Sequence, residues 1–251
     1  MLACRGVIDP RKVRVLTAEP PELLVYDEPT PCPYLDAKEA HLPMRLPVRP
    51  LNREEMSEKL AQGDRRQGLV LYNPSCSDCT ACEAIRIDVS QFTATRSQRR
   101  ALKRGDKHFE VLIASPQSTP HKVELYNEHK RARSLLGDGE CIDEAGYDAF
   151  LVESCTESFE MRYHIQEELV GVAIVDRASD ALSAVYTYFD PSYSSYSPGV
   201  YSILKQIELC QRWGLRYLYL GLYIEGCSSM QYKSLYRPHQ RLVNERWQHF
   251  S

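Results

Sequence analysis

Hydrophobic and polar residues alternate along three consecutive segments in the second half of the chain. These segments are residues 159–165, 169–176 and 182–189, and short polar turns join them. Alternation with a period of two is typical of half-buried strands, so the pattern predicts an antiparallel meander. Residues 200–213 then place apolar side chains three or four positions apart, which predicts a helix, and the apolar run at residues 216–224 predicts a central strand.

The rest of the chain is divided by prolines, glycines and changes of period. Prolines are frequent in the first 50 residues, which predicts irregular, extended structure there rather than helix. The expected elements are a short strand at 13–16, a helix at 53–62, strands at 69–72 and 84–89, a helix from 96 to 105, a strand at 109–114, and helices at 122–136 and 145–155.

The order of these elements predicts an α+β fold. Two helices, a three-strand meander, a helix and a closing strand follow one another, as in an acetyltransferase-like (GNAT-like) fold. We therefore expect an acetyltransferase-like catalytic domain at residues 116–251, preceded by an N-terminal domain with the cysteines and a basic helix at residues 1–115. The loop after the meander holds one glycine, Gly199, where that fold usually cradles coenzyme A with a glycine-rich turn, so acyl-CoA is a poor donor candidate.

Six cations lie along the predicted helix that begins at residue 96: Arg96, Arg99, Arg100, Lys103, Arg104 and Lys107. Steps of three and one place them on one helical face. Ser97 or Thr95 could cap this helix, and Gly105 could end it. A solvated face is the usual fate of a charge run. Because only Asp106 opposes the cations, we favour a polyanion and expect recognition of a structured RNA by shape and backbone.

Three thiols at a repeated C-x2-C spacing, Cys76, Cys79 and Cys82, precede this helix. A tight turn can bring such residues onto one zinc ion or iron–sulfur cluster. The fourth ligand must come from elsewhere, and Cys32, which stands between two prolines, is the best candidate. Three reduced thiols in a loop are the alternative. Since no histidine or carboxylate accompanies them to activate water, we expect a structural or redox-sensing site.

Composition restricts the remaining possibilities. The chain has 251 residues, 43% of them hydrophobic and 26% charged, which suits a globular protein with a sizeable core. A net charge of −3 excludes a globally basic nucleic-acid coat, so any RNA affinity must come from a local patch. Nine cysteines without a regular framework favour a reducing, cytoplasmic setting. The N-terminus lacks an apolar signal core, and no apolar run approaches the roughly 20 residues of a membrane helix.

Short motifs occur in a fixed order from residue 31 to the C-terminal region. They are Pro31-Cys32-Pro33-Tyr34, Arg65-Arg66-Gln67-Gly68, Tyr72-Asn73-Pro74 with Cys76, Cys79 and Cys82, Ser97-Gln98-Arg99-Arg100, Tyr188-Phe189-Asp190-Pro191, Ser197-Pro198-Gly199, Tyr219 to Ile224, Cys227 to Lys233, and Tyr236-Arg237-Pro238-His239. In these motifs the chain resembles the arginyl-tRNA–protein transferases and, more closely, their short bacterial relatives, the aspartate/glutamate leucyltransferases. One departure is Pro198, where leucine is expected before the glycine.

The resemblance implies transfer of leucine from leucyl-tRNA to the N-terminal amine of proteins that begin with Asp or Glu, which marks them for degradation. An aminoacyl ester is already activated, and an α-amino group has a pKa of about 7.7–8.0, so a useful fraction is neutral near pH 7. The enzyme mainly has to position the amine, polarise the carbonyl and assist one proton transfer. The chemistry itself therefore requires no cofactor.

The resemblance also suggests roles for individual residues. Asp190 is the first choice to hold the ammonium or accept its proton, although it could equally start the turn before Pro191. Tyr188 could line the cleft or pack in the core. Lys233 and Arg237 lie in a basic tail and could read the acceptor's acidic side chain or grip the tRNA 3′ end. The full set of expected substrate- and tRNA-binding residues is Arg96, Arg99, Arg100, Lys103, Arg104, Ser197, Gly199, Tyr223, Tyr232, Lys233 and Arg237.

Three other interpretations remain open at this point. The donor could be arginyl-tRNA, because donor choice depends on a pocket that the sequence does not reveal. The cysteines and the basic helix alone would also suit a metal-containing RNA-binding module without catalysis. An ordinary acyl-CoA N-acyltransferase is the third, disfavoured by the missing glycine-rich turn.

Overall fold

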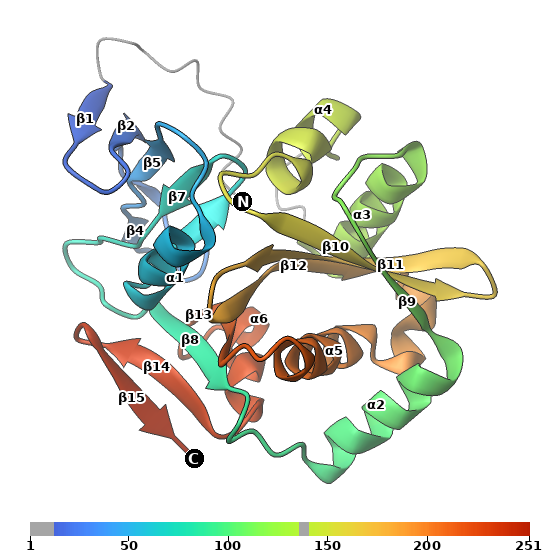
Figure 1. Ribbon diagram of the computed structural model, residues 1–251. Helices are drawn as coiled ribbons and strands as arrows, with labels where there is room; N and C mark the ends of the chain where they lie inside the picture. The colour runs from blue at the N-terminus through green and yellow to red at the C-terminus, as the bar shows by residue number, and fades with distance from the viewer. Residues whose placement is uncertain (1–12, 136–140) are drawn as a thin grey trace.

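The computed structural model describes residues 13–135 and 141–251 (Figure 1). The expected absence of a signal core at the N-terminus and the expected helix end at Leu136 lie outside the described residues. Within these ranges the protein combines α-helices and β-strands, as the element order predicted. No described helix is both long enough and apolar enough to cross a membrane.

A mixed eight-stranded sheet forms the centre of the described structure. Its strand order is β15-β14-β8-β13-β12-β11-β10-β9. The bounds are β8 Glu83–Asp88, β9 Glu110–Ala114, β10 Ser158–Ile165, β11 Glu168–Arg177, β12 Ala181–Phe189, β13 Tyr217–Tyr223, β14 His239–Val243 and β15 Arg246–Phe250. The predicted meander is confirmed as β10, β11 and β12, which pair antiparallel in sequence order.

Helices cover both faces of this sheet (Figure 1). Helix α5 (Pro198–Arg212) lies on one face and buries Ile203, Leu204 and Ile207 against it. Helix α3 (Pro120–Ala132), the short α4 (Glu144–Tyr147) and the π-helical turn η2 (Asp148–Val152) lie on the other. Because strand side chains alternate between faces, the two faces supply separate cores.

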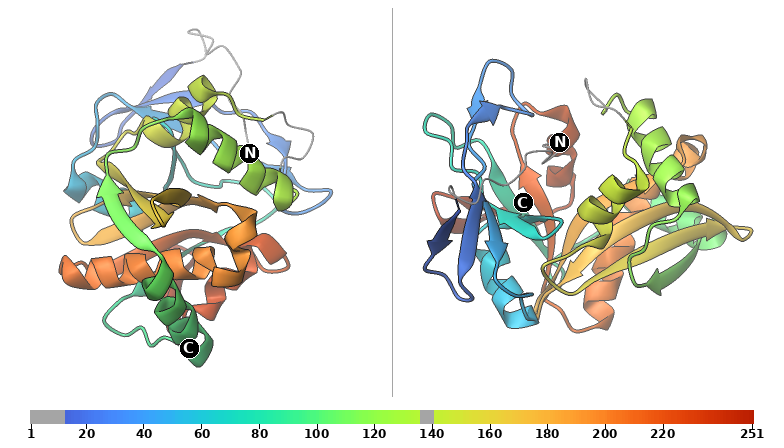
Figure 2. Two further views of the ribbon diagram at one scale, coloured as in Figure 1. Left: turned by 90° about the vertical axis from the view of Figure 1, so that its right-hand side faces the viewer. Right: turned by 90° about the horizontal axis from the view of Figure 1, so that it is seen from above.

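The proline-rich segment forms more strands than expected: the predicted strand at 13–16 is confirmed as β1, and further strands replace the expected irregular structure. A second, five-stranded sheet has the order β1-β2-β5-β7-β6. Its strands are β1 Arg14–Leu16, β2 Glu22–Tyr26, β5 Met44–Pro47, β6 Arg65–Gln67 and β7 Val70–Tyr72, with helix α1 (Arg53–Ala61) between β5 and β6 and a small pair β3 (Thr30–Pro31) and β4 (Glu39–Ala40) beside them. Seen from above, this sheet and helix α3 stand at opposite sides of the molecule (Figure 2). Leu71 of β7 and Met56 of α1 pack in one core cluster with Tyr217 and Tyr219 of the large sheet.

The basic helix α2 spans Arg96–His108. Thr95 caps it, and its hydroxyl accepts from the backbone N–H of Gln98 in a capping box, as one of the two expected caps. The expected helix end at Gly105 is wrong, since Gly105 lies inside the helix. A Cβ there would stand 2.1 Å from the Tyr201 ring, so the glycine lets α2 and α5 approach closely.

The large sheet takes strands from both sides of residue 115, because β8 and β9 precede it and the other six strands follow it. The predicted division of the chain at that residue stays a prediction. The C-terminal tail forms the hairpin β14–β15, which extends the sheet by pairing with β8. Its mixture of charged and aromatic residues carried no clear period and did not predict these strands.

Candidate functional site

The large sheet opens between strands β12 and β13. These two strands run parallel, whereas the other neighbouring strands described in the sheet run antiparallel. Their pairing covers Ala181–Ser183 against Tyr217–Tyr219, and β12 continues to Phe189 beyond it. In open sheets, ligands bind outside the carboxyl ends of parallel strands. The opening between β12 and β13 is therefore the first place to look for a site.

A cavity of about 580 Å³ lies where α2, the start of α5 and the turn η4 (Tyr232–Leu235) meet. Helix α5 follows β12 through the 3₁₀ turn η3 (Pro191–Tyr196), and η4 follows β13 after the short helix α6 (Ser228–Gln231), so two of the cavity walls are segments that come after these strands in the chain. Its walls are formed by Thr95, Ser97, Gln98, Arg100, Ala101, Arg104, Ser197, Val200, Tyr232, Leu235 and Tyr236. It thus combines guanidinium groups with aromatic and aliphatic surface.

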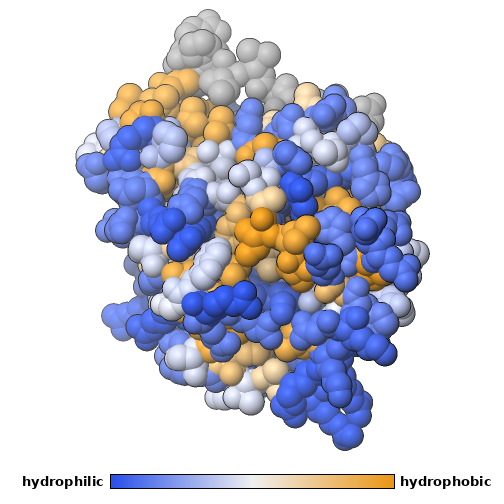
Figure 3. Space-filling view, turned by 45° about the vertical axis from the view of Figure 1, so that its right-hand side comes forward, coloured by the Kyte–Doolittle hydropathy of each residue, from blue (hydrophilic) through white to orange (hydrophobic). Residues whose placement is uncertain are grey.

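The cationic face of α2 is exposed, as expected. The six cations of the predicted stripe are all solvent-exposed, and none forms an ion pair with another described residue. Arg104 donates to the Ser197 hydroxyl at 3.2 Å. Asp106, the acid within the helix, is engaged by Tyr201 and Lys205 at 3.1 and 3.2 Å. On the side of the molecule shown in Figure 3, hydrophilic side chains cover the lower right, below an apolar patch near the centre. The helix therefore offers uncompensated positive charge to a polyanion.

Two of the expected binding residues stand at the start of α5. Ser197 lies in the left-handed region with φ 58° and lines the cavity. Gly199 does not line it, and a Cβ there would meet only Phe189, at 3.7 Å. The structure therefore places Ser197 at the cavity and gives no steric reason for glycine at position 199.

The two expected catalytic residues lie outside the cavity wall. Asp190 caps η3, because its carboxylate accepts from the backbone N–H of Ser192 at 2.7 Å. Tyr188 is fully buried in the core on the α3 side of the sheet, where its hydroxyl contacts that of Tyr147. These positions favour the turn-forming and packing interpretations, and the catalytic roles stay predictions.

The expected residues of the C-terminal region have different surroundings. Tyr232 is 46% exposed and lines the cavity. Tyr223 is packed in the core on the α5 side, with the Arg241 guanidinium 4.5 Å from its ring. Arg237 is exposed and its Nε donates to the Ser234 carbonyl at 3.2 Å. Of these three residues, the structure brings only Tyr232 to the cavity.

Lys233 is buried rather than exposed in a basic tail. Its Nζ donates to the Leu222 carbonyl at 2.6 Å and to the Met230 sulfur at 3.0 Å. Burial first, and then the nearby Arg65, lower the pKa of Lys233 to about 7, against a smaller opposing effect of Cys227. A buried amine near neutrality is a candidate for proton transfer or for holding an anion.

The four candidate metal ligands are free and partly buried cysteines. Burial, and then Cys76, Cys32 and Cys79, raise the pKa of Cys82 to about 12, which places the four thiols within electrostatic range of one another. Among the described residues, no group of three or more His, Cys, Asp or Glu side chains is arranged to hold a metal ion. Thiolates suit zinc or an iron–sulfur cluster, and the predicted site remains untested by this geometry.

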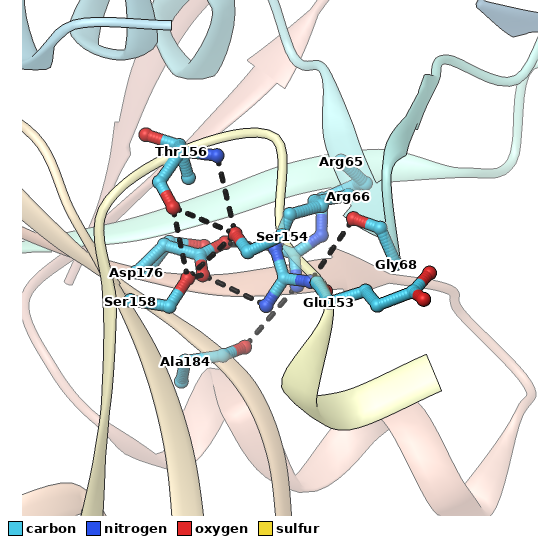
Figure 4. Close-up of polar contacts among 10 residues, drawn as sticks. Arg65, Arg66, Gly68, Glu153, Ser154, Thr156, Ser158, Asp176 and Ala184 are labelled. Atoms are coloured by element: carbon cyan, nitrogen blue, oxygen red, sulfur yellow. Dashed lines mark hydrogen bonds and ion pairs between the residues drawn. The ribbon is translucent and has the colours of Figure 1, made fainter. Parts of the chain in front are cut away.

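Sequence reasoning assigned no role to Arg65 and Arg66, although it noted their motif. Both are buried. Arg66 forms a two-pronged ion pair with Asp176, with both N–O distances 2.8 Å. Arg65 lies at the opening, where its guanidinium donates to the Ser183 hydroxyl and the Ala184 carbonyl of β12 (Figure 4). An arginine pair after a glycine-bounded helix is the signal that could have drawn attention to it.

Comparison with known proteins identifies the family. Models of the N-terminal and C-terminal regions of arginine-tRNA-protein transferases match residues 30–100 and 121–243. The chain belongs to the arginine-tRNA-protein transferase family. It is 37% identical over 221 residues to the aspartate/glutamate leucyltransferase of Saccharophagus degradans, which covers 87% of this chain and 93% of that protein. The Pseudomonas aeruginosa protein of the same name is 36% identical over 220 residues, 88% of this chain and 93% of the relative.

Solved structures give weaker matches. The protein L-PGS of Bacillus licheniformis aligns with a TM-score of 0.43 and 14% identity over 72% of this chain and 54% of that one. FemX aligns with a TM-score of 0.42 and 9% identity over 66% of this chain and 59% of that one.

Proposed function

We propose that this transferase moves leucine from leucyl-tRNA to the N-terminal amine of proteins that begin with Asp or Glu. The observation that carries the proposal is the similarity to aspartate/glutamate leucyltransferases over most of both chains. The added leucine marks the acceptor for degradation, and the cytoplasm is the compartment where both charged tRNA and such acceptors occur. The donor, the acceptor and the compartment are all part of the proposal.

The reaction is an aminolysis of an ester. The neutral α-amine of the acceptor attacks the leucyl carbonyl carbon, and a C–N bond forms. The bond from that carbon to the ribose oxygen of the tRNA breaks, the amine loses a proton, and the ribose oxygen gains one. The ester supplies the driving force, so the protein has to align the two substrates and assist the proton transfer.

The proposed fold class is acetyltransferase-like, with the opening between β12 and β13 as the reaction cleft. The antiparallel meander, the helix α5 that links β12 to β13, and the divergence of those two strands support it. The cavity at the start of α5 is proposed to take the aminoacylated end of the tRNA. Asp190, two residues beyond β12's Tyr188, remains the proposed residue to hold the incoming ammonium.

The tRNA is proposed to lie along α2, with phosphates on its exposed cations. Each phosphate neutralised contributes about one to the slope of log affinity against log salt. Arg100→Gln should therefore weaken binding of deacylated tRNA and lower that slope by about one. Arg212→Gln, at the far end of α5, removes an exposed arginine elsewhere and should leave the slope unchanged. Equal slopes for both variants would contradict this placement.

The cysteines Cys32, Cys76, Cys79 and Cys82 are proposed to hold a structural zinc ion or iron–sulfur cluster. Their thiolates would supply the ligands, and the bound group would pin the N-terminal segment onto the loop that leads to β8. Cys79→Ser should lose the metal, as measured by elemental analysis, and lower the melting temperature. Cys141→Ser, at an exposed cysteine outside the set, is the control. Full activity and unchanged melting of Cys79→Ser would count against the site.

A transfer assay tests the main proposal. Purified protein is given leucyl-tRNA or arginyl-tRNA and peptides that begin with Asp, Glu or Ala. We expect leucine on the Asp and Glu peptides alone. Arginine transfer instead would keep the family chemistry and change the donor. tRNA binding without transfer would favour an RNA-binding module, and acylation by an acyl-CoA would revive the third interpretation.

A further inference from the structure

The Arg65 guanidinium lacks a counter-charge although it is buried. Only 8% of this residue is exposed. It donates to the Ser183 hydroxyl and the Ala184 carbonyl, each at 3.2 Å, and no carboxylate of the described residues lies within 4.0 Å of it. A guanidinium carries five N–H donors. Its third partner is the phenol oxygen of Tyr72, with which it also forms a hydrogen bond, so all three acceptors are neutral.

Two other buried arginines show how the protein normally satisfies such a group. Arg66 has Asp176 as its bidentate partner. Arg86 has no carboxylate, but its guanidinium stacks between Tyr217 at 3.8 Å and Trp247 at 4.0 Å and donates to Gln240 at 2.7 Å. The contacts described for Arg65 include neither a carboxylate nor a stacked ring.

A second buried cation lies close by. Lys233 is 8% exposed, and the charge of Arg65 acts on it unfavourably. The phenols of Tyr34 and Tyr72 also lie within range of Arg65, which opposes part of the pKa increase that burial causes in each. Lys233 and the two phenols thus lie within electrostatic range of Arg65, and no carboxylate among the described residues forms an ion pair with it.

The backbone accommodates this arrangement at Gly221 of β13. A Cβ at Gly221 would stand 3.0 Å from the Arg65 Nη2 atom, and the φ of +89° disfavours any other residue. Strand β13 has an irregular register between Tyr219 and Gly221. The strand is therefore shaped to admit the guanidinium into the opening between β12 and β13.

Burying a cation without a counter-charge is strongly unfavourable, because the charge loses its hydration. Binding of an anion would remove this penalty. A nucleic-acid backbone is a poor fit, because its phosphates need the exposed surface that α2 provides. A single carboxylate fits, since arginine binds it through two parallel hydrogen bonds. The reaction brings one such group into the cleft, on the acceptor.

We propose that Arg65 determines acceptor specificity by pairing with the side-chain carboxylate of the N-terminal Asp or Glu. This inference rests on the proposed function. Binding of that carboxylate at the opening between β12 and β13 holds the adjacent α-amine in the same opening, near Ala184 and Gly221. The amine is therefore assigned to the opening and not to Asp190, which follows the far end of β12. Asn and Gln have nearly the same shape as Asp and Glu, but they leave the guanidinium without a counter-charge, so they are rejected.

The test compares kcat/KM for peptides that begin with Asp or Asn, with Glu and Gln as a second pair. Truncating one partner of a buried charge pair costs about 2–5 kcal/mol, which is a loss of about 30-fold or more. Arg65→Gln should lower kcat/KM for the Asp peptide by at least that factor and bring the Asp/Asn ratio close to one. Arg65→Lys, a point charge without the fork, should retain part of the ratio.

Arg100→Gln is the matched control, because it removes an arginine from the proposed tRNA surface. It should lower transfer to every peptide in proportion and leave the Asp/Asn ratio unchanged. Urea unfolding of each variant shows whether it is folded. If Arg65→Gln does not fold, the folded Arg65→Lys variant decides, and an Asp/Asn ratio equal to that of the wild type overturns the proposal.

Direct binding separates this inference from the proposed function. Calorimetry with the wild type and the Arg65 variants, without tRNA, compares an Asp peptide with an Asn peptide. Tighter binding of the Asp peptide that is lost in the folded variants supports the inference even if no leucine is transferred. Equal binding of both peptides by the wild type overturns it, even if transfer to Asp peptides is observed.

Discussion

Arg65 and Arg66 are neighbours on strand β6 and are both buried, yet their surroundings are opposite. Arg66 is enclosed by Asp176, which also accepts from the Ser158 hydroxyl at 2.5 Å, and by the carbonyls of Gly68 and Glu153. Arg65 faces the opening of the sheet without a carboxylate. Burial alone therefore does not mark a functional cation, and Arg86 shows that a missing carboxylate alone does not either, because stacked rings can take its place.

Removing the carboxylate that pairs with Arg66 should have the largest effect on stability. Asp176→Asn leaves the Arg66 guanidinium buried without its counter-charge and should lower the free energy of unfolding by about 3–5 kcal/mol. Arg65→Gln should cost about 1 kcal/mol, because relief of an uncompensated charge offsets the lost hydrogen bonds. Urea denaturation measures both. Equal losses would show that Arg65 is a structural support like Arg66.

Lys233→Met tests whether the buried lysine near Arg65 makes stability depend on pH. The pKa of Lys233 is lowered to about 7 in the folded protein, from its ordinary value of 10.5. Between these two values the unfolded chain binds more protons, so stability due to this residue rises with pH from about 7 upward.

As the pH rises above about 7, the free energy of unfolding of the wild type should therefore increase relative to that of Lys233→Met. The slope is at most about 1.4 kcal/mol per pH unit, or about 2 kcal/mol between pH 7 and 8.5. Urea denaturation at several pH values measures it, and comparison with the variant cancels the other titrating groups. A difference independent of pH would mean that the lysine stays charged.

Gly221→Ala tests the fit of Arg65 into the opening. The added methyl group meets the guanidinium at 3.0 Å and the backbone has a φ of +89°, so we expect a loss of about 1–2 kcal/mol in unfolding free energy. The displaced guanidinium should also weaken transfer to Asp peptides more than to Asn peptides. Gly199→Ala, where the nearest atom is 3.7 Å away, is the control and should be close to neutral.

Ser183→Ala should have the smallest effect. It removes the hydroxyl that accepts from Arg65 Nη1 and leaves the charge in place. We expect a loss of about 0.5–1.5 kcal/mol in stability or positioning, which corresponds to a few-fold lower kcat/KM for Asp peptides. Steady-state kinetics with Asp and Asn peptides measures it. A loss as large as that of Arg65→Gln would indicate that Ser183, rather than the arginine, contacts the acceptor.

Much of the fold could be predicted because it depends on local patterns. The alternation at residues 159–189 and the helical spacing at residues 200–213 are properties of neighbouring residues, and both are confirmed. In the N-terminal sheet the strands at residues 14–16 and 70–72 were predicted, but β2 and β5 were missed, since the prolines beside them lie at strand ends and turns. Gly105 was assigned as a helix end because glycine is common after the last turn of a helix. The sequence does not show that this glycine instead makes room for the Tyr201 ring.

The site was predictable only in part. The exposed cations of α2 could be found from spacing because a charged stripe is a one-dimensional pattern. The environments of Tyr188 and Lys233 could not, because whether a side chain is in the core or at a cleft depends on segments distant in the sequence. The catalytic roles assigned from the resemblance are accordingly still predictions.

The family, the meander, helix α5 and the cationic face of α2 could all be read from the chain alone, because motif order and periodicity are properties of neighbouring residues. The tertiary structure alone decided that β12 and β13 diverge, and that Arg65 enters the gap while Arg66 finds Asp176, 110 positions away. The sequence alone does not distinguish these two adjacent arginines. Their electrostatic environments differ because long-range packing brings a carboxylate to one of them and leaves the other for a ligand.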